Sequence, residues 1–275
     1  MNVIANPHGA PKSSDWQDVA YYESLKACDR RHWAWLWSRR NQDNRRLSED
    51  RLGLKRWTQL APSVWFLKSG RLDDLFRAGH YVFPGKGPQE HPDARLFWRP
   101  DLDPCVIDVH AEPTDVSNPL AFDLARFRDK ATVLLDPTNR EMVLFSEGPR
   151  HLQLEVRSGT LVKGPVQLSF SLDGVAHMAL RTQVLMRLSV LSESAKMPFA
   201  LFPPARRGRW WSEALRAHDA ECAGATQREI ADFLYVRISE RPAWKGQETL
   251  LKNRVRQLLI AGKKAINGDY LQFLL

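Results

Sequence analysis

The chain has 275 residues, of which 43% are hydrophobic and 26% are charged. This composition is typical of a folded globular protein and excludes a disordered or fibrous chain. No stretch is apolar over the ~18 residues that a membrane span needs, and the first residues lack the apolar core of a signal peptide. The three cysteines, Cys28, Cys105 and Cys222, form no Cys-x-x-Cys pair, so neither a disulfide framework nor a zinc knuckle is predicted. We therefore expect a cytoplasmic protein without a membrane partner.

Charge is distributed unevenly along the chain, whose net charge is +8. Residues 1–60 carry 11 basic and 7 acidic side chains, a net charge of +4. Residues 61–175 carry 13 and 16, giving −3, and residues 176–275 carry 16 and 9, giving +7. Two basic ends around a mildly acidic centre favour a polyanionic partner such as nucleic acid. A solvated cationic surface has the same composition, so charge alone does not decide.

The first part of the chain is predicted to be a small helical unit that follows a loose arm of about a dozen residues. Ser14 or Asp15 can cap a helix, and residues 16–40 contain neither Pro nor Gly. The spacing of the apolar residues predicts one long helix, or two short helices separated near Cys28 and Asp29. The tryptophans cannot share one helix face, so we expect a hydrophobic core rather than a base-stacking platform. They are Trp16, Trp33, Trp35 and Trp37.

The central part contains short apolar runs bounded by Pro, Gly and Asp, which predict strands of roughly four to seven residues. Turn signals lie between them at residues 136–139 and at Ser158-Gly159. A small antiparallel sheet is the predicted arrangement. The predicted strands are residues 64–67, 96–98, 106–109, 132–135, 142–145, 151–156 and 166–172.

Beyond Asp173-Gly174 the pattern is helical. A first helix is predicted over residues 175–194, followed by a connection marked by Pro198 and by residues 202–204. A basic cluster of three arginines precedes the next predicted helix. They are Arg206, Arg207 and Arg209.

Residues 211–234 show the pattern of two helices joined by a tight turn. Trp211, Leu215, His218 and Cys222 recur at helical spacing, and Gly224 follows where a left-handed helix end is expected. Thr226 and Glu229 have the spacing of a capping box that starts the second helix. Its predicted buried residues are Ile230, Ala231, Phe233 and Leu234. This is the helix-turn-helix pattern, although a plain helical hairpin would show the same signals.

A third helix is centred on a buried face formed by Leu251, Val255, Leu258 and Gly262. Gly262 either allows close approach of another helix or ends this one. The remaining face is basic and contains no acidic residue. Arg and Lys can bind phosphates or guanine, and Asn or Gln can pair with adenine, so we favour DNA recognition over a solvated face. The residues of that face are Lys252, Asn253, Arg254, Arg256, Gln257, Lys263 and Lys264.

The strongest candidate for a metal or catalytic site is the alternating trio Asp108, His110 and Glu112. The solvent-exposed face of a half-buried strand has the same pattern, and no second ligand cluster is evident. Nucleophile, dinucleotide-binding and phosphate-loop motifs are missing. We expect no catalytic residue, no cofactor and no metal.

Residues 224–231 (Gly-Ala-Thr-Gln-Arg-Glu-Ile-Ala), Trp244, residues 251–259 and Gly268-Asp269-Tyr270 resemble a known family. They look like the C-terminal helix-turn-helix variant of proteobacterial transcriptional activators, which include a type VI secretion regulator and regulators of conjugative-element transfer. In that family a long segment, here residues 235–246, separates the second and third helices, and Trp244 would anchor it. The resemblance implies an oligomer.

The N-terminal part is similar to the small transcriptional regulator-like domain often found ahead of this one. The similarity rests on Asp15-Trp16, Tyr22, Leu25 and residues 33–41. Residues 42–44 read Gln-Asp-Asn where the family often has Pro-Asp-Tyr.

Together these observations predict an α+β protein of three parts. Residues 1–60 form the aromatic-rich helical regulator-like domain, 61–175 the β-rich domain, and 176–275 the all-helical helix-turn-helix domain. We expect a homo-oligomeric regulator that binds promoter DNA, an activator of secretion-system or mobile-element genes with RNA polymerase as a further partner. The alternative is an antiactivator or adaptor whose basic helices bind an acidic protein. The predicted DNA-binding residues are Arg206, Arg207, Arg209, Gln227, Arg228, Lys245, Lys252, Asn253, Arg254, Arg256, Gln257, Lys263 and Lys264.

Overall fold

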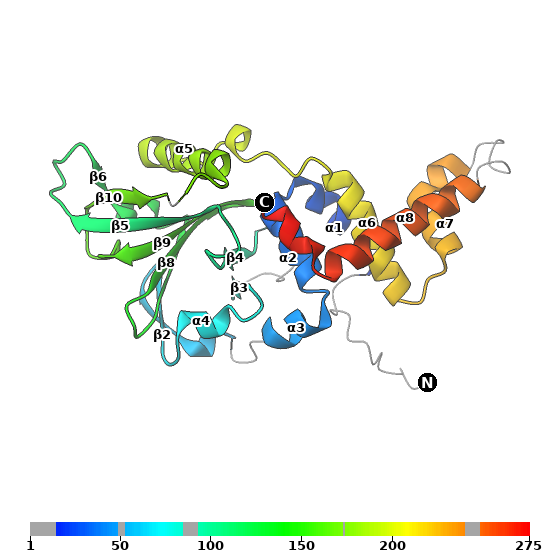
Figure 1. Ribbon diagram of the computed structural model, residues 1–275, viewed down its shortest axis with the longest axis horizontal. Helices are drawn as coiled ribbons and strands as arrows, with labels where there is room; N and C mark the ends of the chain where they lie inside the picture. Colours follow the sequence, from blue (N-terminus) through cyan, green and yellow to red (C-terminus); the bar gives the residue numbers. More distant parts are fainter. Residues whose placement is uncertain (1–14, 49–52, 85–92, 173, 240–247) are drawn as a thin grey trace.

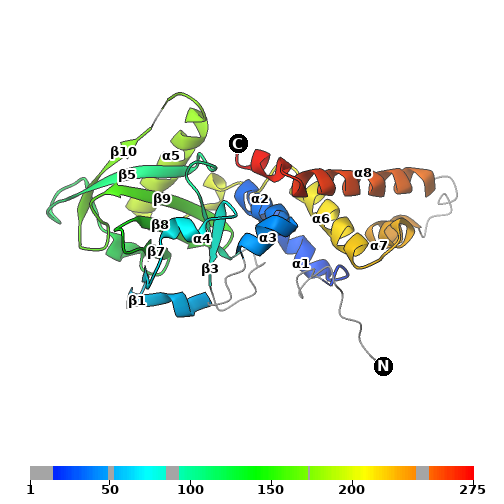
Figure 2. The same cartoon turned by 60° about the horizontal axis from the view of Figure 1, so that its bottom comes forward.

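The computed structural model describes residues 15–48, 53–84, 93–172, 174–239 and 248–275. The molecule is elongated, with a β-sheet at one end and a group of helices at the other (Figure 1). The N-terminal and C-terminal helices lie together at the helical end, while the central strands form the sheet (Figures 1 and 2). Within the described residues, no helix is long and apolar enough to cross a membrane.

The N-terminal helices are α1 (Val19–Ser24), the 3-10 turn η1 (Leu25–Ala27), α2 (Arg30–Ser38) and α3 (Gln42–Ser48). Of the two alternatives from the sequence, the one with two short helices is confirmed. Cys28 is extended, and the Asp29 carboxylate caps α2 by accepting from the His32 amide at 2.9 Å. The prediction that Asp15 caps the first helix was wrong. Asp18 caps α1, because its carboxylate accepts a hydrogen bond from the Tyr21 amide at 3.1 Å. Ser14 lies outside the described residues.

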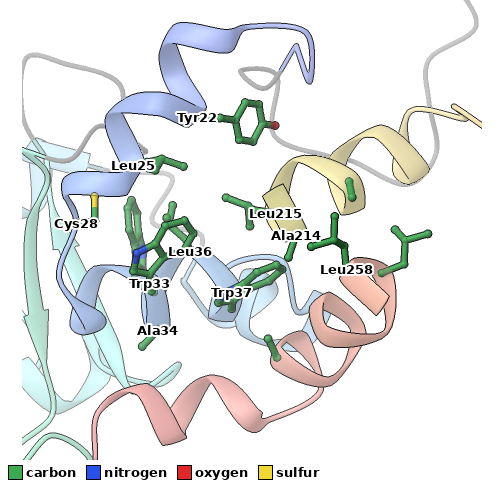
Figure 3. Packing of buried hydrophobic residues seen from close by; sticks show 14 of the residues in the cluster. Tyr22, Leu25, Cys28, Trp33, Ala34, Leu36, Trp37, Ala214, Leu215 and Leu258 are labelled. Atoms are coloured by element: carbon green, nitrogen blue, oxygen red, sulfur yellow. The ribbon is translucent and has the colours of Figure 1, made fainter. Parts of the chain in front are cut away.

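The predicted tryptophan core is confirmed, and it is shared between the two ends of the chain. Trp33, Trp35 and Trp37 are at most 1% exposed, whereas Trp16 is half-buried. They pack with residues of α6 (Gly208–Cys222) and α8 (Glu248–Ile266) in one cluster. In Figure 3 the side chains of Trp37, Ala214 and Leu258, from three different helices, converge. The N-terminal helices therefore bury their apolar side chains against the C-terminal ones.

The predicted small antiparallel sheet was wrong, because the central strands form one eight-stranded mixed sheet in the order β1-β2-β7-β8-β9-β5-β10-β6. Two neighbouring pairs, β2 with β7 and β5 with β9, are parallel. Parallel neighbours need long connections, so turn signals between consecutive strands could not reveal them. The strands are β1 (Trp57–Ala61), β2 (Val64–Leu67), β5 (Val106–Pro113), β6 (Ala121–Phe122), β7 (Ala131–Leu135), β8 (Glu141–Glu147), β9 (Arg150–Ser158) and β10 (Val166–Ser171).

A separate two-stranded sheet consists of β3 (His80–Phe83) and β4 (Arg95–Trp98). The apolar runs of the sequence predict β4 but not β1, β3 or β6. β1 is exposed at four of its five residues, so it lacks the apolar run used for prediction. The short helical elements are η2 (Gly53–Arg56), α4 (Leu72–Leu75), η3 (Leu124–Phe127), η4 (Phe199–Leu201) and η6 (Asp269–Phe273).

Helix α5 (Met178–Ser194) confirms the helix predicted over residues 175–194, with its start three residues later. Its buried residues Val184, Leu188 and Leu191 belong to the core of the sheet, together with Val109 and Leu154. α5 therefore covers the sheet rather than the helices that follow it (Figure 1). The proposed division at residue 176 remains a prediction.

A buried polar network joins the sheet to the helical end. Arg31 of α2 pairs with Asp103 at 2.5 Å and donates to the Gln153 side chain of β9 at 2.9 Å. Gln153 in turn exchanges hydrogen bonds with the backbone of Trp98. Because buried charges are tolerated only when paired, these contacts restrict how the two ends can move relative to each other.

Candidate nucleic-acid interface

Helices α6 and α7 (Gln227–Ser239) are joined by the turn that the sequence predicted. Gly224 has φ +90, and the amides of Gly224 and Ala225 donate to the carbonyls of Glu221 and Ala220 at 3.0 and 2.9 Å. This is a Schellman helix end, which requires the left-handed conformation that Gly adopts at low cost. The angle between the two helices is thus set by local chemistry.

The capping box at the start of α7 is also confirmed. The Thr226 amide donates to the Glu229 carboxylate at 2.7 Å, and the Glu229 amide donates to the Thr226 hydroxyl at 3.3 Å. These hydrogen bonds lower the pKa of Glu229, because they stabilise its charged form. Both residues are exposed, so the box defines the start of the helix rather than its packing.

The predicted buried face of α7 holds for Ile230 and Ala231, while Phe233 and Leu234 are only half-buried. The helix continues to Ser239 across a kink at Tyr235, so the long segment predicted from residue 235 begins later than expected. Two expectations of the sequence, Trp244 as an anchor and Lys245 as a DNA-binding residue, lie outside the described residues.

Helix α8 has 19 residues and places Val255, Leu258 and Leu259 in the core, with Leu251 half-buried. Gly262 is buried in its interior, and a Cβ there would lie 3.4 Å from the ring of Trp37. Of the two alternatives for Gly262, close approach is therefore confirmed and a helix end is wrong. The helix continues through Lys263 and Lys264 to Ile266.

Every predicted DNA-binding residue that the structure describes is exposed. On α8, at 100° per residue, Asn253, Gln257 and Lys264 lie within about 20° of the direction opposite the buried Val255, the exposed Ile260 lies about 40° from it, and Arg256 lies about 80° from it. We call Asn253, Arg256, Gln257 and Lys264 the outer stripe of α8. It combines two amide side chains with two cations on one rigid helix.

Arg254 and Lys263 lie on the flanks of α8 and contact α6, which α8 crosses (Figures 1 and 2). Arg254 is 3.5 Å from the Glu213 carboxylate and lies 4.7 Å over the Trp210 ring, and Lys263 is 3.1 Å from Glu221. The sequence prediction missed these carboxylates because they belong to another helix. Arg254 and Lys263 are therefore held in place as well as exposed.

Glu213 is the point where three helices meet. Besides Arg254 of α8, its carboxylate pairs with Arg209 of α6 at 3.3 Å. It also accepts a hydrogen bond from the hydroxyl of Tyr235 of α7 at 3.3 Å. Burial raises the pKa of Tyr235 to about 12, and the nearby Glu213 charge adds to the effect. The only sign of this junction in the sequence was the four-residue spacing of Arg209 and Glu213.

Of the basic cluster, Arg209 takes part in this junction through Glu213. Arg206 and Arg207 directly precede α6, where Gly208 packs against the Lys26 carbonyl. Gln227 and Arg228 occupy the first turn of α7, beside a groove lined by Trp16, Gln17, Glu229 and Asp232. Those two carboxylates make the groove less suited to a phosphate than the outer stripe.

Asp108, His110 and Glu112 alternate on β5 with the buried Val109 and Ala111, as expected for the solvent-exposed face of a half-buried strand. His110 is hydrogen-bonded through both ring nitrogens, to Ser158 at 2.8 Å and Ser171 at 3.0 Å. Asp108 pairs with Arg157 at 2.9 Å. In the part of the chain that the structure describes, no three His, Cys, Asp or Glu side chains are placed to hold a metal ion.

Residues 171–275 match the model of a family described as "T6SS, Transcription factor, DNA binding domain". The match covers fewer than half of the residues of the chain, and it includes α5, α6, α7 and α8. It supports the resemblance of the C-terminal part; the N-terminal part is not included in it. No curated protein matches the chain.

Proposed function

Because the C-terminal region matches a transcription factor DNA-binding domain, we propose that this protein is a sequence-specific regulator that reads double-stranded DNA with α8. The observation that carries the proposal is the outer stripe of α8, which is polar and basic on a helix anchored over Trp37. The alternative, an adaptor that binds an acidic protein, is not favoured by the family match.

The residues of the outer stripe suit two kinds of contact. Asn253 and Gln257 can each form a pair of hydrogen bonds with adenine in the major groove, and Arg256 can pair with guanine or a phosphate. Arg206, Arg207 and Lys264 carry no geometry that favours a base, so we assign them to phosphates. Phosphate contacts position the protein and base contacts specify the sequence.

The regulatory role, the target genes and the further partners are part of the same proposal. We propose an activator of secretion-system or mobile-element genes that contacts promoter DNA and RNA polymerase in the cytoplasm and has no catalytic activity. The family description supports the DNA-binding role and the link to a secretion system. The activator role and the mobile-element genes rest on the resemblance of residues 224–231 and 251–259.

We also propose that the protein is a homo-oligomer that assembles through its sheet. β6 pairs only with Val166 and Gln167 of β10, so on the side of β10 opposite β5 no described strand lies beside residues 168–171. Phe170 on this edge is 42% exposed, and the edge lies at the opposite end of the molecule from α8 (Figure 1). An antiparallel pairing of two such edges is self-complementary and leaves both copies of α8 accessible.

Light scattering of the full chain tests this assembly. A chain that ends near Pro204 lacks α6, α7 and α8. It cannot be used to locate the assembly surface, because it would expose the tryptophan core that α6 and α8 cover. We expect Phe170→Lys to lower the oligomeric state without unfolding the chain. A monomeric parent protein, or an unchanged oligomer in the variant, contradicts assembly through β10.

Footprinting on DNA from the genomic neighbourhood of the gene, followed by titrations at several salt concentrations, tests DNA reading. The logarithm of the affinity should fall with the logarithm of salt concentration, with a slope of about −0.9 per phosphate neutralised. Asn253→Ala and Arg256→Ala should each lose roughly 1 to 3 kcal/mol of specific binding without unfolding. The buried Leu258→Ala is the contrasting variant, since it should destabilise the fold by roughly 2 to 5 kcal/mol. A salt slope near zero contradicts the proposal.

A further inference from the structure

Helix α3, from the N-terminal part of the chain, is attached to the C-terminal end of α8. The Asn41 side chain donates to the Ile266 carbonyl at 3.0 Å, and the Asn44 side chain donates to the Tyr270 hydroxyl at 2.8 Å. The Asn41 side chain also accepts from the amides of Asp43 and Asn44, which caps α3. Two asparagines thus position α3 relative to the end of α8.

α3 carries Arg45 and Arg46, which are not among the predicted DNA-binding residues. The Arg46 side chain is 78% exposed, and the carboxylate of Asp43 is 3.9 Å away and itself 86% exposed. Such an exposed pair contributes little and is easily exchanged for a phosphate. Arg45 is half-buried. These two arginines of α3 and the lysines Lys263 and Lys264 in the last turn of α8 place four cations at this end of α8, alongside the carboxylates of Asp43 and Asp269.

The dimensions of α8 bring this end of the helix to the DNA backbone. Nineteen residues at 1.5 Å per residue give a helix of about 28 Å. The major groove of B-DNA is only about 12 Å wide. A helix of this length that lies across the groove extends past its edges, so the segment attached to its end meets phosphates. The carbonyl end of α8 alone would repel them, and nearby cations offset that repulsion.

We propose that α3 is a second phosphate-binding surface, in which Arg45 and Arg46 bind the backbone of the DNA that flanks the segment read by α8. This inference rests on the proposed function. The guanidinium group suits this role because it binds phosphate oxygens in pairs and stays charged at all physiological pH values. The surface would add affinity for any sequence and would not change which sequence is preferred.

The test compares the full-length parent with the double variant Arg45→Ala/Arg46→Ala on two DNA fragments. One fragment contains the flanks of the footprint, and the other is trimmed to the segment that α8 protects. On the long fragment we expect the salt slope of the variant to be smaller by about 0.9 for each phosphate that the two arginines neutralise in the parent. On the trimmed fragment the variant and the parent should bind equally.

The matched control is Arg126→Ala/Arg128→Ala, which removes the same charge from exposed positions at η3, beside the sheet. It should bind the long fragment like the parent. Two results overturn the α3 inference while DNA reading by α8 stands. In the first, Arg45→Ala/Arg46→Ala has the same salt slope as the parent on the long fragment. In the second, its salt slope is reduced equally on both fragments. If the parent binds neither fragment, the proposed function fails and the inference fails with it.

Discussion

The guanidinium of Arg40 donates two hydrogen bonds to the carboxylate of Asp219, from Nε at 2.7 Å and from Nη2 at 2.6 Å. The two side chains are only 3% and 8% exposed. The Tyr22 hydroxyl donates to the same carboxylate at 2.8 Å, and burial, followed by the Asp219 charge, raises the pKa of Tyr22. Tyr22 of α1 and Arg40, which lies between α2 and α3, thus share one buried carboxylate of α6.

Replacing Arg40 by Ala should destabilise the fold by about 3 to 5 kcal/mol, because it leaves the buried Asp219 charge unpaired. Arg40→Lys should have a smaller effect, since one ammonium keeps the charge but cannot reproduce the two parallel hydrogen bonds. Urea unfolding followed by tryptophan fluorescence measures both changes. Arg46→Ala, an exposed arginine on α3, is the control and should unfold like the parent. Equal stability of Arg40→Ala and the parent would show that this pair does not hold the helices together.

Substitutions at Gly262 should have graded effects. An Ala Cβ at 3.4 Å from Trp37 is in ordinary contact, and Ala favours a helix interior over Gly by up to about 1 kcal/mol. Gly262→Ala should therefore be as stable as the parent or more so. Gly262→Leu must push α8 away from Trp37, at a cost of roughly 1 to 3 kcal/mol, and should weaken DNA binding. Thermal unfolding and DNA titration measure the two effects, and a Leu variant equal to the parent in both would contradict the close packing.

Neutralising Glu213 should strengthen non-specific DNA binding. Glu213→Gln removes the carboxylate that attracts Arg209 and Arg254, so both become more available to phosphates. We expect an affinity gain of about two- to fivefold for DNA of random sequence, matching the roughly 0.4 to 1 kcal/mol of an ion pair whose cations are exposed. The gain should be smaller for the specific site, because Arg254 is no longer held in one orientation. Glu193→Gln, at the exposed end of α5, is the control. A Glu213→Gln variant that binds more weakly than the parent would oppose this role.

Stability should decrease in mildly acidic solution because of two buried histidines. Burial lowers the pKa of His80 and of His151 to about 4, from an ordinary value of 6.5. Between these values the unfolded chain binds protons that the folded chain does not, so stability is full above about pH 6.5 and falls as the pH drops towards 4. From pH 7 to pH 5 each histidine should account for a loss of about 2 kcal/mol.

Urea unfolding at pH 7 and pH 5 measures this loss. His80→Gln should remove about half of the difference between the two pH values, while the exposed His177→Gln should leave it unchanged. A difference of the same size in His80→Gln and the parent would assign the pH dependence to other groups.

The helix-turn-helix region was predictable because its signals are local. Gly224, Thr226 and Glu229 act within a few residues of one another, and the conformations they favour do not depend on the rest of the chain. The buried face of α8 was visible for a similar reason, since helical periodicity places Val255 and Leu258 on one side whatever the partner is.

Which segment of the chain each of these faces packs against depended on the tertiary structure. The sequence by itself predicted that Trp33, Trp35 and Trp37 are buried, that α8 has one apolar and one basic face, and that Gly224 ends a helix. Only the fold decided that the tryptophans pack against α6 and α8, that the sheet contains parallel pairs, and that Glu213 meets Arg254. These contacts join residues distant along the chain, and their free energy comes from burying the two surfaces together, which no local pattern of either segment can specify.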